Sequence, residues 1–178
     1  PFQGGKVTVN PKFPLEVHGW HLDERADLDL VLVHGHNMHP RDLLPFADSL
    51  GVHARVIAPK APYRVSRHGW SWWPDDPELL FRRLAGGPTD LHDLRPRDRV
   101  LSRLAMKATL TGLGFPRPGA RAVILGFSQG GMLACDLLLH EAVKMDAAVL
   151  VSSSCIALDE WRVRASKLAG VPVLVAHG

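Results

Sequence analysis

The chain is poor in cysteine and has no apolar run long enough to cross a bilayer. Its two cysteines, Cys135 and Cys155, lie in apolar surroundings without a C-x-x-C or metal-ligand pattern. We therefore expect reduced core thiols in a cytoplasmic protein without a membrane span, a single disulfide being the alternative.

Concentrated charge of either sign is also absent. Lys and Arg number 21 and Asp and Glu 18, and the basic residues are scattered among the acids. A nucleic-acid surface needs a patch or stripe of basic side chains, so we expect no nucleic-acid partner. With 178 residues, 46% of them hydrophobic, the chain has the material for one domain with a buried core. The oligomeric state stays open, a dimer included.

Strand-like and helix-like patterns alternate along the chain. Short apolar runs predict strands at 28–33, 53–58, 121–127, 147–151 and 171–176. Helical spacing predicts helices at 40–50, 96–111, 132–143 and near 159–168. This order predicts an α/β fold, a mostly parallel sheet with helices on both faces.

Three of these segments carry more specific expectations. The apolar face of helix 96–111 is expected to comprise Leu101, Leu104, Ala105 and Ala108. Helix 132–143 is apolar nearly all round and is expected to be buried on every side. The first 25 or so residues, with alternating Val7 and Val9, are expected to add antiparallel edge strands.

The most informative motif is Gly126-Phe-Ser-Gln-Gly-Gly131, between a predicted strand and a predicted helix. In a nucleophile elbow, a sharp strand-to-helix turn strains the central residue and lifts its hydroxyl clear of the sheet. Ser128 is therefore the predicted catalytic nucleophile. The helix start behind it supplies positive potential for an oxyanion. A serine in a tight turn without chemistry is the plainer alternative.

A histidine-rich turn, Val33-His-Gly-His-Asn37, follows the first predicted core strand. A His-Gly turn at this point presents a backbone N–H toward the nucleophile, so His36 and Gln129 are the predicted oxyanion-hole donors. The alternatives are a zinc site at His34, His36 and His39, or plain loop histidines without a function. No acidic or cysteine partner accompanies them, so we expect no metal.

Three tryptophans stand close together in Gly69-Trp-Ser-Trp-Trp-Pro74. Exposing such large rings to water is costly, so they either pack into the core or line an apolar cleft. Trp70, Trp72 and Trp73 are the candidate substrate-binding residues.

Together these pieces resemble the phospholipase/carboxylesterase family of α/β-hydrolases, which includes the acyl-protein thioesterases. The similarity runs from about Leu28 to the last residue and rests on Leu32-Val-His-Gly35, Ala58-Pro-Lys-Ala-Pro62, Trp70-Ser-Trp-Trp73, Gly126-Phe-Ser-Gln-Gly-Gly131, Val149-Leu-Val-Ser-Ser153 and Val171-Pro-Val-Leu-Val-Ala-His-Gly178. It implies the α/β-hydrolase fold and hydrolysis of carboxylic ester or thioester bonds in small-molecule substrates, without cofactor.

The resemblance also implies where this chain departs from the family. Asn37 stands where the family turn usually has a second glycine, and Asn tolerates left-handed backbone angles. The triad acid and histidine are expected beyond Gly178, so 1–178 is expected to be an α/β-hydrolase domain incomplete at its C-terminal end, inactive by itself. His177, Asp146 and Asp159 are accordingly not assigned to the triad.

Two other functions remain open from the sequence. A non-catalytic ligand-binding or interaction module on the same fold accounts for the missing triad members. Dienelactone-hydrolase-like chemistry ranks lower, because that group typically uses cysteine where this chain has Ser128.

Overall fold

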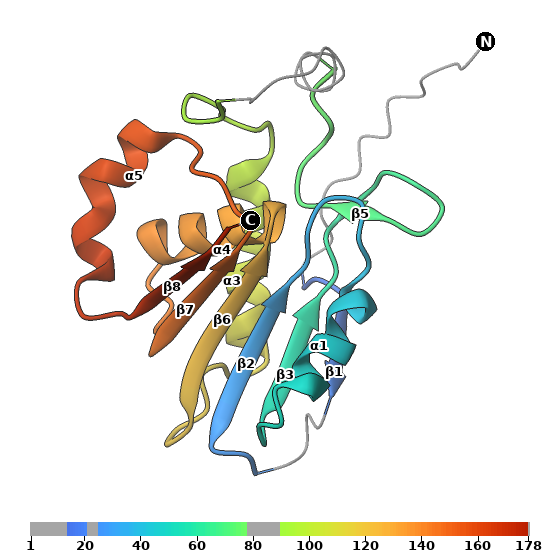
Figure 1. Cartoon of the computed structure of the whole chain (residues 1–178), viewed down its shortest axis with the longest axis vertical. Helices are drawn as coiled ribbons and strands as arrows, with labels where there is room; N and C mark the ends of the chain where they lie inside the picture. Colours follow the sequence, from blue (N-terminus) through green and yellow to red (C-terminus); the bar gives the residue numbers. More distant parts are fainter. Residues whose placement is uncertain (1–13, 21–24, 78–89, 178) are drawn as a thin grey trace.

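A six-stranded sheet forms the centre of the computed structural model, which describes residues 14–20, 25–77 and 90–177 (Figure 1). The strands lie in the order β1 (Val17–Trp20), β3 (Arg55–Pro59), β2 (Leu28–Val33), β6 (Arg121–Phe127), β7 (Ala147–Val151), β8 (Val173–Ala176). Only β1 is antiparallel to its neighbour. The predicted mostly parallel sheet is confirmed.

The expected strands agree closely with the observed ones. β2, β6 and β7 have the predicted bounds, whereas β3 and β8 each begin two residues later than expected. β1 supplies one antiparallel edge strand near the N-terminus, whereas Val7 and Val9 lie outside the described residues. The tryptophan segment adds an unpredicted two-stranded ribbon of β4 (Tyr63–Arg64) and β5 (Trp70–Ser71).

Helices cover both faces of the sheet (Figure 1). One face packs against η1 (Pro40–Leu43) and α1 (Leu44–Ser49), a 3₁₀ turn and an α-helix where a single helix was expected. The other packs against α3 (Arg99–Gly112) and α4 (Gln129–His140), with α5 (Leu158–Arg164) and η2 (Ala165–Leu168) beside them. The three-layer arrangement predicted from the sequence is therefore present.

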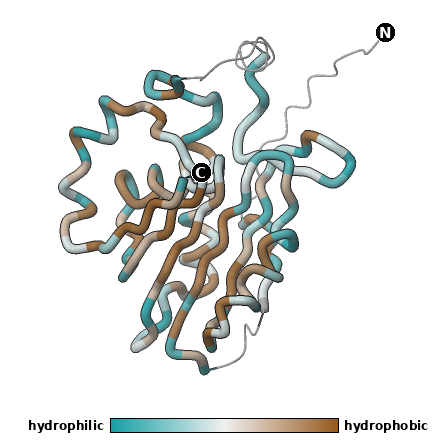
Figure 2. The backbone as a smooth tube through the Cα atoms, viewed as in Figure 1, coloured by the Kyte–Doolittle hydropathy of each residue, from teal (hydrophilic) through white to brown (hydrophobic). Residues whose placement is uncertain are grey.

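The side chains of β2 point alternately to the two faces of the sheet, so one strand contributes to two hydrophobic cores. Leu30 and Leu32 point into the core under η1 and α1, whereas Val31 and Val33 point into the core under α3 and α4. Successive side chains of a strand face opposite sides of the sheet, so an unbroken apolar run suits a strand covered on both faces. Figure 2 shows this hydrophobic composition along the central strands.

The predicted apolar face of α3 is wrong. Leu101 and Leu104 are 37% and 39% exposed, Ala108 is exposed, and only Ala105 of the expected four is buried. The inner face is centred on Met106 and Leu110, and it continues through polar residues that hydrogen-bond within the interior. A hydrophobicity pattern misses a buried face that is partly polar.

Helix α4 is enclosed along almost its whole length, as its all-round apolar composition predicts. Cys135 on this helix is mostly buried, and burial raises the pKa of its thiol to about 12. The expectation of a second core thiol is wrong, because Cys155 is exposed in the loop after β7; both cysteines are free. Within the described segments, no helix combines the length and hydropathy needed to span a membrane.

Candidate active site

Ser128 occupies the reversal between β6 and the 12-residue helix α4. Its backbone has φ 51° and ψ −117°, a strained combination for a residue with a side chain. The reversal is tight: a Cβ on Gly130 would lie 2.0 Å from the carbonyl oxygen of Val33, and one on Gly126 would lie 2.5 Å from the Cα of Gly131. The glycines of the motif are therefore required by backbone-to-backbone packing.

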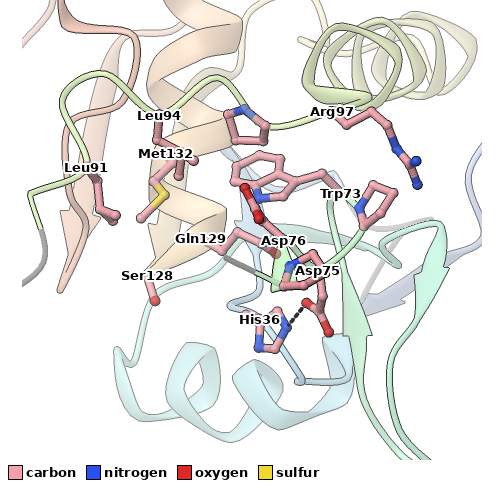
Figure 3. A pocket seen from close by; sticks show the side chains of 13 residues that line it. His36, Trp73, Asp75, Asp76, Leu91, Leu94, Arg97, Ser128, Gln129 and Met132 are labelled. Carbon is pink, nitrogen blue, oxygen red and sulfur yellow. Dashed lines mark hydrogen bonds and ion pairs between the residues drawn. The ribbon is translucent and has the colours of Figure 1, made fainter. Parts of the chain in front are cut away.

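A cavity of about 300 Å³ opens above this reversal (Figure 3). Ser128, Gln129 and His36 all contribute to its lining. The apolar part of the remaining wall consists of Trp73, Pro74, Pro77, Leu91, Leu94, Pro96 and Met132. Its charged part consists of Asp75, Asp76 and Arg97. Four of the six candidate site residues, His36, Trp73, Ser128 and Gln129, thus meet at one cavity, although they come from three separate parts of the chain.

Two residues of the cavity lining, His36 and Gln129, carry the backbone amides that the sequence predicted as oxyanion donors. Among the described residues, no acceptor pairs with the amide N–H of His36 or with that of Gln129. Gln129 is the first residue of α4, where helix amides have no partner in the preceding turn. Unpaired amides at a helix start attract negative charge.

The side chain of His34 stabilises the turn that carries His36. The buried His34 ring hydrogen-bonds through Nδ1 to the carbonyl oxygen of Gly35 (2.8 Å) and receives the amide N–H of Ala61 at Nε2 (3.1 Å). This pattern places the proton on Nδ1. Burial lowers the pKa of His34 to about 4, so the ring is neutral at physiological pH.

Asn37 adopts φ 57°, the left-handed conformation that the sequence suggested it would tolerate. Its amide N–H donates to the carbonyl oxygen of Trp70 at 2.9 Å, and the Trp70 amide donates to Met38 at 3.0 Å. The tryptophan segment approaches this turn so closely that a Cβ on Gly69 would lie 2.0 Å from Asn37 Oδ1. The turn after β2 is thus bound to the tryptophan segment.

The three tryptophans have different surroundings. Trp73 lines the cavity, whereas Trp72 is fully buried and donates from Nε1 to the carbonyl oxygen of His34 at 2.7 Å. The half-buried Trp70 ring lies 4.5 Å from Lys60 Nζ and is not part of the cavity lining. Trp72 is therefore a core residue, its burial made possible by the internal acceptor of its indole N–H, and Trp73 is the tryptophan that stays a candidate for substrate binding at this cavity.

Each histidine of the turn has its own partner. His36 Nε2 hydrogen-bonds to Asp75 Oδ1 at 2.7 Å near the cavity, whereas His39 Nδ1 accepts from the Arg41 amide and caps η1. The candidate triad members declined from sequence also lie elsewhere: Asp146 accepts from the Ala122 amide, Asp159 pairs with Arg95, and His177 is exposed beyond β8. None of these three lines the cavity.

Several lining residues escaped the sequence analysis. Asp75 directly follows the tryptophan segment and could have been included with it. Leu91 and Leu94 lie in a stretch without periodicity, and Arg97 falls within the predicted helix 96–111, although the observed helix begins only at Arg99. Only the fold brings these residues to the cavity of Ser128.

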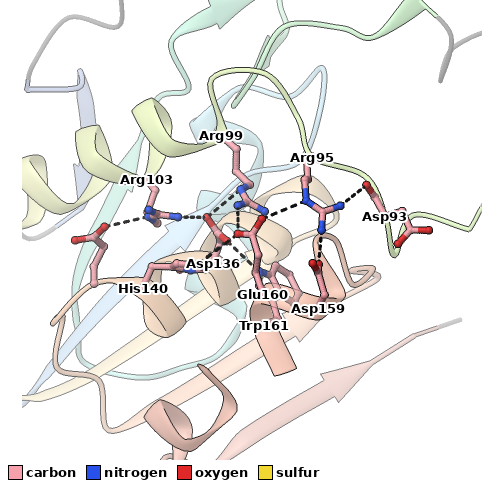
Figure 4. A network of polar contacts seen from close by, with 10 residues as sticks. Asp93, Arg95, Arg99, Arg103, Asp136, His140, Asp159, Glu160 and Trp161 are labelled. Carbon is pink, nitrogen blue, oxygen red and sulfur yellow. Dashed lines mark hydrogen bonds and ion pairs between the residues drawn. The ribbon is translucent and has the colours of Figure 1, made fainter. Parts of the chain in front are cut away.

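A second group of ionisable side chains lies where α3, α4 and α5 meet (Figure 4). Its centre is Asp136, which is fully buried and accepts from Arg103 Nη1 and Trp161 Nε1, both at 2.9 Å. Arg99 approaches the same carboxylate at 3.6 Å and pairs with Glu160 at 2.5 Å. None of these residues lines the Ser128 cavity, and their opposite charges compensate one another in the interior.

Residues 98–178 match the family model described as Phospholipase/Carboxylesterase, a stretch that includes Ser128 and Gln129. No curated protein matches the sequence at a significant level.

Solved structures resemble most of the described fold. They include a carboxylesterase from Mesorhizobium loti (17% identity, TM-score 0.66, covering 92% of this chain and 71% of the other), esterase PE8 (19%, 0.66, 92% and 89%) and acyl-protein thioesterase 2 from Zea mays (16%, 0.68, 92% and 75%). At such identities the likeness concerns the fold. The chain has the α/β-hydrolase fold, as predicted.

Proposed function

We propose that this chain is a serine hydrolase that cleaves carboxylic ester or thioester bonds through an acyl-enzyme on Ser128. The observation that carries the proposal is the position of Ser128, which is strained at a strand-to-helix reversal and lines a cavity together with His36 and Gln129, whose backbone amides have no acceptor among the described residues. The family match over residues 98–178 supports the same chemistry.

In this mechanism Ser128 Oγ attacks the acyl carbonyl carbon, and the carbonyl oxygen takes up the negative charge. The amides of His36 and Gln129 donate to this oxyanion, and the start of α4 adds positive potential. Expulsion of the alcohol or thiol leaves the acyl group on Ser128, and water then releases it as the acid.

A general base must take the Ser128 proton and return it to the leaving group. In the family that the sequence resembles, a histidine oriented by an acid performs this step. We assign neither role to any residue within 14–20, 25–77 or 90–177. His36 already uses Nε2 for Asp75.

The cavity supports a small or medium acyl group. Its apolar part is formed by Trp73, Leu91, Leu94 and Met132, with a volume of about 300 Å³ overall. Apolar walls with a few placed polar groups are typical of sites for small organic ligands. The chemistry requires neither metal nor organic cofactor.

Labelling of the complete protein with a fluorophosphonate probe tests the proposal. We expect covalent labelling that is abolished in Ser128→Ala. Ser152→Ala is the matched control, because Ser152 also follows a parallel strand and has a left-handed φ of 49°. Labelling that persists in Ser128→Ala refutes the assignment. A folded wild-type protein that binds ligands in the cavity but is never labelled supports the non-catalytic module instead.

We also propose a cytoplasmic location. Both cysteines are free, and Cys155 is exposed. An exposed thiol without a disulfide partner suits a reducing compartment.

A further inference from the structure

The two proposed oxyanion donors lie on separate parts of the chain. His36 belongs to the turn after β2, and Gln129 begins α4. An oxyanion hole stabilises charge only when its donors are already in place, because reorientation during the reaction costs free energy. The pairing of β2 with β6 already places the two strand ends side by side, so what remains to be fixed is the turn that carries His36 relative to Gln129.

The side chain of Gln129 is bound to the tryptophan segment. Gln129 Oε1 accepts the amide N–H of Trp72 at 2.9 Å, and Gln129 Nε2 donates to Ser71 Oγ at 2.9 Å. Ser71 Oγ in turn donates to the carbonyl oxygen of Trp73 at 2.6 Å. Ser71 is completely buried and Gln129 nearly so, which makes these hydrogen bonds inaccessible to competing water.

The same segment is bound to the turn of His36. Asp75 holds the His36 imidazole at 2.7 Å, and Trp72 Nε1 holds the carbonyl oxygen of His34 at 2.7 Å. Along the backbone, the Asn37 amide donates to the Trp70 carbonyl oxygen and the Trp70 amide donates to the Met38 carbonyl oxygen. Residues 70–75 thus connect the two segments that carry the donors, His36 on one side and Gln129 on the other.

We infer that Ser71 is a positioning residue for the oxyanion hole, its hydroxyl fixing residues 70–75 to the side chain of Gln129 and so setting the distance between the His36 and Gln129 amides. The inference rests on the proposed function. The Ser71 hydroxyl donates one hydrogen bond and accepts another, and an alanine side chain can do neither.

Loss of this hydroxyl has a definable consequence. The carbonyl oxygen of Trp73 and the Nε2 group of Gln129 would lose their partner, and both lie in the interior. Buried polar groups without partners are costly, so the segment is expected to shift until they find others. A shift of residues 70–75 moves His36 relative to Gln129, which weakens oxyanion binding more than substrate binding.

Ser102 supplies a matched control. It is another fully buried serine, and its hydroxyl donates to the carbonyl oxygen of Trp72 in the same segment. That bond joins the segment to α3 and involves neither His36 nor Gln129. Ser102→Ala therefore removes a comparable buried hydrogen bond without touching the connection between the donors.

Hydrolysis of p-nitrophenyl esters and inhibition by a trifluoromethyl ketone, measured on the complete protein, test the inference. The serine oxygen adds to the ketone carbonyl carbon, and the carbonyl oxygen becomes the oxyanion of a tetrahedral adduct. For Ser71→Ala we expect kcat to fall and the inhibition constant of the ketone to rise by about tenfold each, with KM within about twofold, a smaller effect than outright loss of an oxyanion donor. Ser102→Ala should lose similar thermal stability and keep kcat within about twofold.

Two further variants cover failure of Ser71→Ala to fold. Ser71→Thr retains the hydroxyl and should recover most of the activity. Gln129→Met removes the bond to Ser71 from the other partner, together with the bond from the Trp72 amide, keeps its own backbone amide, and should also lower kcat.

The outcomes separate the two proposals. A folded Ser71→Ala with unchanged kcat and inhibition constant, or equal losses in Ser71→Ala and Ser102→Ala, overturns the positioning role and leaves the hydrolase assignment standing. A wild-type protein with neither esterase activity nor labelling at Ser128 overturns the proposed function and this inference with it.

Discussion

The indole nitrogen of Trp72 donates a hydrogen bond of 2.7 Å to the carbonyl oxygen of His34, and the two rings lie 5.1 Å apart. Both side chains are fully buried, and 37 residues separate them in the sequence. The bond joins the tryptophan segment to the residue that directly follows β2, two residues before His36. The turn that presents His36 is therefore supported by the core and is not a free loop.

The stability of the protein is expected to depend on pH through His34. Its pKa is about 4 in the folded protein and near its ordinary value of 6.5 in the unfolded chain. As pH falls below 6.5, the unfolded chain binds a proton first, so the contribution of neutral His34 is complete above pH 6.5 and is lost progressively down to pH 4. The free energy of unfolding should be about 2 kcal/mol lower near pH 5 than near pH 7.5 from this group alone.

Urea unfolding of the wild type and His34→Gln at both pH values measures this contribution. Glutamine does not titrate, so the variant should lack that part of the pH dependence, whatever its own stability. Equal pH dependence in the two proteins would contradict the assignment of a neutral, buried His34.

Neutralising Asp136 should destabilise the protein strongly. Asp136→Asn leaves the buried guanidinium groups of Arg99 and Arg103 without their shared carboxylate, a loss of about 3–5 kcal/mol. The control is Asp159→Asn, whose side chain is 69% exposed and pairs with Arg95 at the surface, where water screens the pair and its loss should change stability far less. Chemical denaturation of both variants gives the comparison, and similar losses would show that the buried pairs contribute no more than the exposed one.

Adding one methyl group at Gly130 should prevent the reversal at Ser128 from forming. The new Cβ would lie 2.0 Å from Val33 O and 2.5 Å from His34 O, and backbone atoms cannot yield as a flexible side chain does. We expect Gly130→Ala to lose more than about 4 kcal/mol of stability or to fail to fold. Gly112→Ala, at the end of α3 with nothing within 4 Å, should instead gain about 0.5 kcal/mol. Thermal unfolding of the two variants checks both directions, and a stable Gly130→Ala would exclude the tight packing.

Shortening the wall of the cavity should change substrate preference under the proposed function. Trp73→Leu opens space beside Met132, so the preferred acyl chain of p-nitrophenyl esters should become longer. Trp70→Leu removes an equal side chain that contacts Lys60 outside the cavity and should leave the preference unchanged. The measurement is kcat/KM as a function of acyl length for each variant. Identical profiles for the two variants would contradict a role of Trp73 in substrate binding.

Much of the fold follows from local pattern. The strands at 28–33, 121–127 and 147–151 are short, apolar and β-branched, and they occupy the positions predicted for them. The strain at Ser128 and the left-handed Asn37 also follow from local chemistry, because glycine spacing and an Asn in a turn constrain the backbone directly. Local pattern fails in α3, where Arg99 and Arg103 are buried because Asp136 lies opposite on another helix.

What the sequence by itself determined was the layered α/β architecture and the placement of Ser128 at a strand-to-helix reversal, since both depend on residues close together in the chain. Only the tertiary structure decided that Trp73 borders the cavity while Trp72 is core, and that Ser71 and Gln129 hydrogen-bond across 58 residues. Such contacts depend on how distant segments pack, and neither hydrophobic periodicity nor motif spacing contains that information.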